Sequence, residues 1–207
     1  MSALFLKGLL FGFILAATVG PMWVLCFRRT IQFGPAAGLA SGMGIAVADG
    51  LYGAVAAFGL TMISGFLLQH AFWIGLLGAV FLIHLGFKTL LSKPALNDSA
   101  QPNVSHAAAF LSTLGLTLAN PPTILAFAAI FAGLGLVSGA DYTSAALITL
   151  AVFLGSASWW LILAGGAGWL RGRMGTGLLR AINVVSGLSI LGFAVWQLSQ
   201  LTWGSLA

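Results

Sequence analysis

The chain has 207 residues, of which 60% are hydrophobic and only 5% are charged, and its mean hydropathy is +1.08. Soluble domains carry about 25% charged residues, so this composition predicts an integral membrane protein and excludes a soluble catalytic domain. The net charge of +5 arises from basic residues in predicted short loops, where they set membrane orientation, and does not indicate nucleic-acid binding.

The first predicted span covers residues 4–27 and is interrupted by Gly20-Pro21. Proline removes a backbone donor and crowds the carbonyl four residues earlier. Glycine is accepted at a helix N-cap, and proline suits the first helical position. The dipeptide therefore predicts a new half-helix that begins inside the membrane. Arg28 and Arg29 are expected to close the span in a basic loop.

The second predicted span, residues 34–64, carries a stripe of small residues every fourth position: Gly34, Gly38, Gly42, Ala46, Gly50 and Ala54. On a helix this spacing gives a smooth face that lets another helix approach closely, within one chain or between copies in a homo-oligomer. Asp49 is an acidic residue deep in this apolar run, where a carboxyl group is costly. We interpret it as binding a substrate ammonium group, a proton, or each in turn. The alternative is a protonated acid bonded to a backbone carbonyl.

The rest of the chain predicts four more spans, which makes an all-α fold of six transmembrane helices. They cover residues 71–91, 107–137, 142–170 and 178–203, and a polar loop over residues 92–105 contains two prolines. We expect this loop to be a cytoplasmic linker between two halves, residues 1–91 and 106–207. In the fifth span, Trp160 is either a packing residue or a cavity wall that offers its ring to an ammonium group. Ser156, one turn earlier, is a candidate donor to the substrate.

An internal similarity relates the first and fourth spans. GPMWVLCF from Gly20 aligns with NPPTILAF from Asn120, and Pro21 matches Pro121. Because each half has three spans, the second half enters the membrane from the opposite side, which predicts two inverted three-helix repeats. Each half-helix start would direct free amides and a positive dipole end towards the membrane centre, where they bind carboxylates. The alternative is a pair of plain proline kinks.

The basic residues are distributed unequally between the two sides of this topology. One side has Lys7 alone, and the other has Arg28, Arg29, Lys88, Lys93, Arg171, Arg173 and Arg180. The positive-inside rule places the seven in the cytoplasm and both termini outside it. The single cysteine, Cys26, cannot form a disulfide within the chain.

Taken together, these motifs resemble the LysE/RhtB superfamily of amino-acid exporters. The resemblance rests on GP in the first span, the basic turn, the glycine-rich run ending in G-x-x-x-A-D, NP in the fourth span and GSASWW in the fifth. It implies proton-driven export of an amino acid or similar small molecule across a bacterial inner membrane, without a cofactor. It also implies that substrate or ion is bound at Gly20, Pro21, Asp49, Asn120 and Pro121. Many members follow NP with lysine where this chain has Pro122, which leaves the substrate open.

Three other classes of function fit the sequence less well than a secondary active exporter. A passive channel does not need an inverted repeat with broken helices. A metal-ion exporter would need several Cys, His or carboxylate ligands, and only Asp49 and His84 qualify. An enzyme would need a deep Ser/His/Asp set or paired carboxylates, which the spans do not supply. We therefore expect neither an enzyme nor a bound metal.

Overall fold

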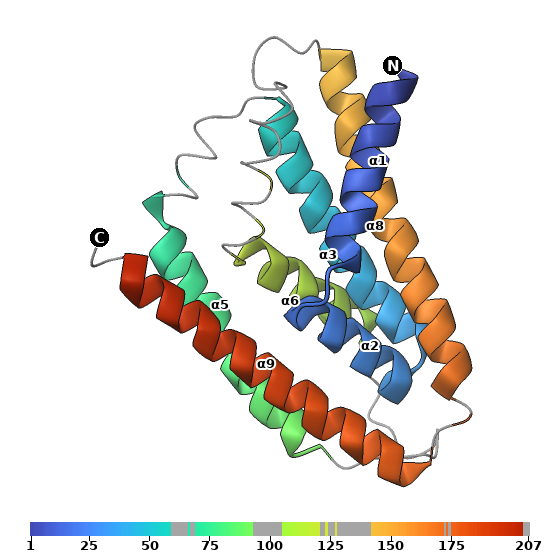
Figure 1. The fold of residues 1–207 in the computed structure, drawn as a ribbon, viewed down its shortest axis with the longest axis vertical. Coiled ribbons are helices and arrows are strands. Elements are labelled where there is room, and N and C mark those ends of the chain that lie inside the picture. The colour runs from blue at the N-terminus through green and yellow to red at the C-terminus, as the bar shows by residue number, and fades with distance from the viewer. Residues whose placement is uncertain are drawn as a thin grey trace.

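The computed structural model describes residues 1–58, 66, 69–92, 105–120, 123, 127, 142–171, 173 and 175–204. The regular structure in these residues is helical throughout, which confirms the predicted class (Figure 1). The helices are α1 (Ser2–Ala17), α2 (Pro21–Phe33), α3 (Pro35–Ala57), α5 (Ala71–Leu90), α6 (His106–Leu118), α8 (Tyr142–Arg171) and α9 (Thr176–Gly204).

Four of these helices, α3, α5, α8 and α9, are long and apolar enough to cross a membrane. A fifth span is reached if α1 and α2 are counted as one broken span, since together they pass the same test while bent by 73°. The apolar helix α6 has 13 residues and corresponds to the first part of the predicted fourth span. Most of the remainder of that span lies outside the described residues.

The break in the first span falls at the predicted dipeptide. α1 ends at Ala17, and Thr18 and Gly20 have extended backbone conformations. α2 then begins at Pro21 with Gly20 as its N-cap. The prediction that a new helix starts at Gly20-Pro21 is therefore confirmed.

The predicted loop position of Arg28 and Arg29 is wrong. α2 continues to Phe33 and holds both arginines in its interior, where they are 6% and 8% exposed. The connection to α3 is reduced to Gly34, whose φ of +94° is strained for any residue with a side chain. Arginine is a good helix former, and the polar partners described below stabilise it at these buried positions.

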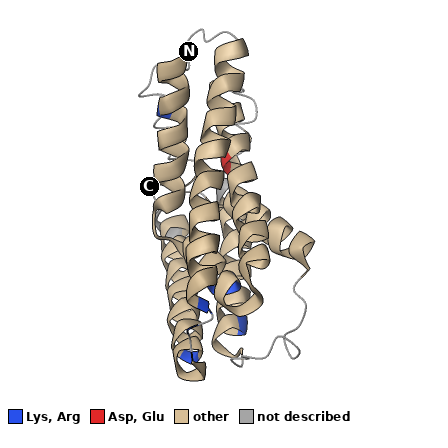
Figure 2. Cartoon of the chain, turned by 90° about the vertical axis from the view of Figure 1, so that its right-hand side faces the viewer, with Lys and Arg blue, Asp and Glu red and all other residues tan. Residues whose placement is uncertain are grey.

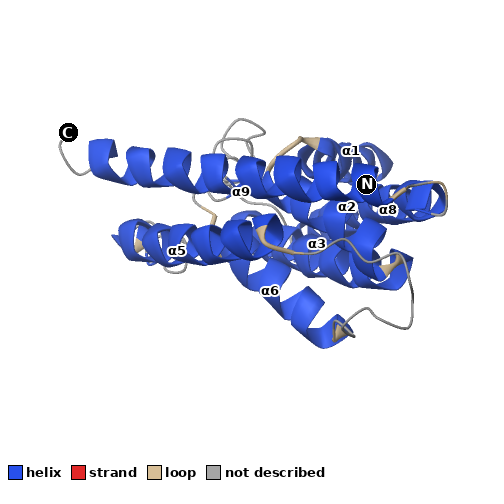
Figure 3. Cartoon of the chain, turned by 90° about the horizontal axis from the view of Figure 1, so that it is seen from below, coloured by secondary structure: helices blue, strands red, loops and turns tan. Residues whose placement is uncertain are grey.

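The centre of the fold is α3, which packs against α2, α6 and α8. α1 lies along α8, and α5 lies along α9, which also packs against α2 (Figures 1 and 3). The small residues of α3 are used within this chain: a Cβ at Gly38 would meet Thr30 of α2, and one at Gly42 would meet Trp160 of α8. The glycine stripe therefore brings α3 close enough to α8 for side chains on the two helices to bond.

Charged residues are segregated along the helices. Figure 2 shows Lys and Arg gathered towards one end of the bundle, with the acidic position between the two ends. Lys7 lies in the second turn of α1. This arrangement agrees with the charge asymmetry predicted from the sequence.

Candidate functional site

A cavity of about 330 Å³ lies where α1 gives way to α2. Its wall is built from α1, α2, α3, α6, α8, α9 and the segment that follows α6. Cavities that bind small molecules typically measure about 300–1,000 Å³, so this one suits a single small ligand. Five of the site residues predicted from the sequence line it: Gly20, Pro21, Asp49, Asn120 and Trp160.

Asp49 supplies the carboxyl group of the cavity. It is 2% exposed, and its Oδ2 accepts a hydrogen bond of 2.7 Å from Ser156 Oγ. Trp160 Nε1 in turn donates to Ser156 Oγ over 3.2 Å. The alternative of a carboxyl group bonded to a backbone carbonyl is therefore not what the structure shows. Oδ1 has no hydrogen-bond partner among the described residues, so one carboxyl oxygen is available to a ligand.

Ser156 and Trp160 lie one turn apart on α8, so both side chains face α3. Trp160 lines the cavity, but Ser156 does not. Ser156 is fully buried and donates to Asp49. The geometry thus makes Ser156 a group that orients the carboxyl, and Trp160 a cavity wall whose indole nitrogen holds that serine in place.

The N-terminus of α2 contributes backbone donors. Pro21 has no N–H, and the amide of Val24 bonds to Gly20 O over 3.1 Å. The amides of Met22 and Trp23 have no partner among the described residues, as expected in the first turn of a helix. Both residues line the cavity. The positive end of the α2 dipole therefore adjoins the space that Asp49 borders.

The segment after α6 contributes polar side chains. α6 ends at Leu118, and Asn120 follows in the cavity wall, where its Nδ2 donates to Thr123 Oγ1 over 2.9 Å. The helix that forms the first part of the fourth span therefore ends just before Asn120, as the predicted interruption requires. Pro121 and Pro122 lie outside the described residues, and so does any half-helix that begins there.

Sequence reasoning missed Thr117, which lines the same cavity from the last turn of α6. It is 2% exposed, and its Oγ1 has no hydrogen-bond partner among the described residues. Thr30, Thr89 and Thr113, also buried in helices, each donate to the carbonyl four residues earlier. The only signal in the sequence was a threonine three positions before Asn120 in an apolar helix.

The two buried arginines of α2 do not line the cavity. They donate hydrogen bonds to different neighbouring helices. Arg29 donates to Ser41 Oγ on α3 at 2.9 Å, and on α6 to Ala109 O at 3.0 Å and Ser112 Oγ at 2.9 Å. Arg28 donates to Asn183 Oδ1 on α9 and to Ser92 Oγ after α5, over 3.2 and 2.8 Å. In the described part of the chain the one carboxyl side chain is Asp49, so neutral oxygens satisfy both guanidinium groups.

We predict that Arg29→Lys lowers the stability of the purified protein by about 1–3 kcal/mol, because a lysine cannot reproduce the planar fork that reaches three acceptors. The charge is unchanged, so the effect isolates the geometry. Thermal unfolding in detergent measures it. Arg180→Lys, at an exposed position of α9, is the matched control and should change stability by less than about 0.5 kcal/mol. Equal shifts for the two variants would contradict the prediction.

The fold and cavity define a class: a multi-pass, all-helical membrane protein with a ligand-sized cavity at the break of its first span. Comparison with known families agrees. The family model described as "LysE type translocator" matches residues 13–200. The chain therefore belongs to the LysE type translocator family, whose members are translocators and not enzymes.

A similar protein is "Putative amino acid efflux protein YcgF" of Bacillus subtilis (strain 168). It is 26% identical to this chain over 198 residues, which cover 93% of this chain and 94% of that protein. No solved structure matches the chain.

Proposed function

We propose that this translocator is a secondary active exporter of an amino acid or a related small zwitterion, coupled to protons. The observation that carries the proposal is the cavity in which a buried carboxyl group and a helix N-terminus adjoin the same space. A zwitterion presents the complementary pair of charges. The name of the Bacillus relative, which refers to amino acid efflux, supports the same class of substrate.

Each end of the substrate has a partner of matching chemistry. The free amides of Met22 and Trp23, after Gly20-Pro21, would hold the carboxylate. Asp49 would hold the ammonium group or the coupling proton through Oδ1, with the Trp160 ring close by for a cation–π contact. Ser156 would keep the carboxyl oriented. Asn120 and the neighbouring Pro121 would complete the site from the second half of the chain.

The helix pairs support the proposed inverted repeat. In an inverted repeat, α1, α3 and α5 of the first half correspond to α6, α8 and α9 of the second. Exchanging the halves turns the α1–α8 pair into the α6–α3 pair, and both pairs are in contact. The α3–α8 and α5–α9 pairs each map onto themselves, and both are present as well. Such pseudo-symmetry lets two halves move against each other around a central site, which is the basis of alternating access.

The charge segregation supports a membrane orientation. We place the basic end of the bundle in the cytoplasm, because Lys and Arg are retained there, and both termini outside it. Export from a bacterial cytoplasm would then begin at the basic end and finish at the end where α1 starts.

Reconstitution into proteoliposomes tests the proposal. Individually labelled amino acids are offered under an imposed pH gradient, and we expect saturable flux that accelerates with the gradient and stops when a protonophore collapses it. Flux that neither saturates nor responds to the gradient would instead indicate a passive channel. Movement of a divalent cation in place of every amino acid would indicate the metal-ion exporter.

A further inference from the structure

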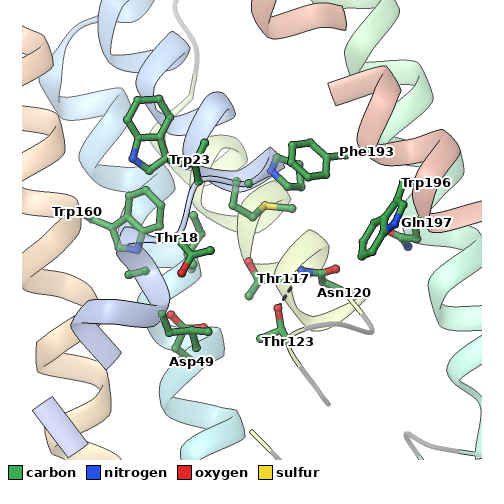
Figure 4. Close-up of a pocket in the computed structure, with 17 residues that line it drawn as sticks. Thr18, Trp23, Asp49, Thr117, Asn120, Thr123, Trp160, Phe193, Trp196 and Gln197 are labelled. Atoms are coloured by element: carbon green, nitrogen blue, oxygen red, sulfur yellow. Dashed lines mark hydrogen bonds between the residues drawn. The ribbon is translucent and has the colours of Figure 1, made fainter. Parts of the chain in front are cut away.

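We infer that the cavity selects an amino acid whose side chain is uncharged and apolar, and that Thr117 binds the carboxylate of this substrate. The inference rests on the proposed function and narrows its substrate class. It starts from the division of the cavity into two chemically different sides. Figure 4 shows Asp49 and Trp160 on one side, Phe193 and Trp196 on the opposite side, and Thr117 between them.

The charge of the lining argues against substrates with a charged side chain. Of the described residues that line the cavity, Asp49 alone has an ionisable carboxyl or basic group. A substrate with two cationic groups would find one carboxyl for both of them, and one of its charges would be buried without a partner. A substrate with an acidic side chain would find no cationic side chain at all. Burial of an unpaired charge is costly, so both kinds are disfavoured.

The aromatic side of the cavity favours an apolar substrate side chain. Phe193 and Trp196 project from α9 towards the cavity, across from Asp49. Trp196 lines the cavity and is 49% exposed. Gln197 Nε2 donates to Gly75 O over 2.6 Å, so the polar group that Gln197 still offers to this side is its amide oxygen. Apolar contact with the two rings is therefore the larger interaction that this side offers to a substrate side chain.

Thr117 is a donor without an acceptor. Its Oγ1 is buried and unpartnered among the described residues, although it lines the cavity. A buried hydroxyl left unsatisfied is unfavourable, and native structures rarely tolerate one without a reason. A substrate carboxylate held by the α2 amides would accept from this hydroxyl. The cavity therefore supplies two sources of donors for the same carboxylate, from α2 and from α6.

The experiment measures gradient-driven flux of a transported, labelled amino acid in proteoliposomes, with unlabelled amino acids as competitors. We expect leucine and phenylalanine to compete, and lysine and aspartate at equal concentration not to. Thr117→Val should raise KM about tenfold, the effect of losing one hydrogen bond to a charged group, while Thr117→Ser should restore it. Trp196→Ala should raise KM for leucine more than for alanine. Val195→Ala, exposed and outside the cavity wall, is its control.

The possible outcomes distinguish failure of the inferred selectivity from failure of the proposed export function. Gradient-driven flux of lysine or aspartate in preference to leucine would overturn the inferred selectivity and leave the exporter intact. A Thr117→Val protein with wild-type KM would overturn the role of the hydroxyl. If no amino acid moved in response to the gradient, the proposed function itself would fail, and this inference with it. Thermal unfolding of each variant in detergent identifies any loss of flux that is due to misfolding.

Discussion

Gly155→Leu is expected to separate α1 from α8 and prevent the stable fold, whereas Gly165→Leu on the same helix should leave the fold intact. A Cβ at position 155 would meet the carbonyl oxygen of Leu9 and lie 2.9 Å from the backbone nitrogen of Phe13, both on α1. Backbone atoms cannot rotate away, so the helices must move apart. At Gly165 a Cβ would have nothing within 4 Å. We expect a loss of about 3 kcal/mol or more for the first variant, at the upper end of overpacking effects.

The measurement is the yield of monodisperse protein after extraction in detergent, followed by thermal unfolding. The two variants add the same side chain to the same apolar helix, so they differ only in what that side chain meets. Gly12→Leu provides a second test from the other side of the interface, because a Cβ there would meet the backbone of Val152. Wild-type yield and stability for Gly155→Leu would show that the α1–α8 contact is not required for the fold.

The features that could be predicted from the sequence are those that depend only on neighbouring residues in the chain. The sequence predicts spans three, five and six to within two residues of the bounds of α5, α8 and α9, because an apolar run of membrane length is a local signal. The break at Gly20-Pro21 was predictable for a similar reason: a proline lacks its N–H wherever it occurs. Asp49 could be selected because a carboxyl group in an apolar run is costly without knowledge of its neighbours.

The features that could not be predicted depend on contacts between residues far apart in the sequence. Ser156 and Asp49 are 107 positions apart, and nothing in either motif indicates that they bond. The sequence predicts Arg29 in a loop after the first span, yet the structure buries it in a helix, where Ser112, 83 positions away, helps to satisfy it. Thr117 has an ordinary helical context, and only the cavity beside it makes its hydroxyl unusual.

Asp49→Asn is expected to reduce gradient-driven transport severely while the fold is retained. Asparagine has nearly the same shape, and its amide oxygen accepts the Ser156 hydrogen bond that Oδ2 accepts now. The variant loses only the negative charge and the capacity to take up a proton. Removing one partner of a buried charge pair costs about 2–5 kcal/mol, so we expect a fall in kcat/KM on the order of a hundredfold. Flux is measured in proteoliposomes with and without the pH gradient.

The pattern of loss distinguishes the two proposed roles of Asp49. If it carries only the coupling proton, Asp49→Asn keeps exchange of substrate for substrate in the absence of a gradient. If it binds the ammonium group, exchange is lost as well. Ser156→Ala is the control, because it leaves the carboxyl in place and removes only the donor that orients it, so we expect a smaller loss, about tenfold. An Asp49→Asn protein that still responds to the gradient like the wild type would remove this carboxyl from the coupling mechanism, and the proton would need another carrier.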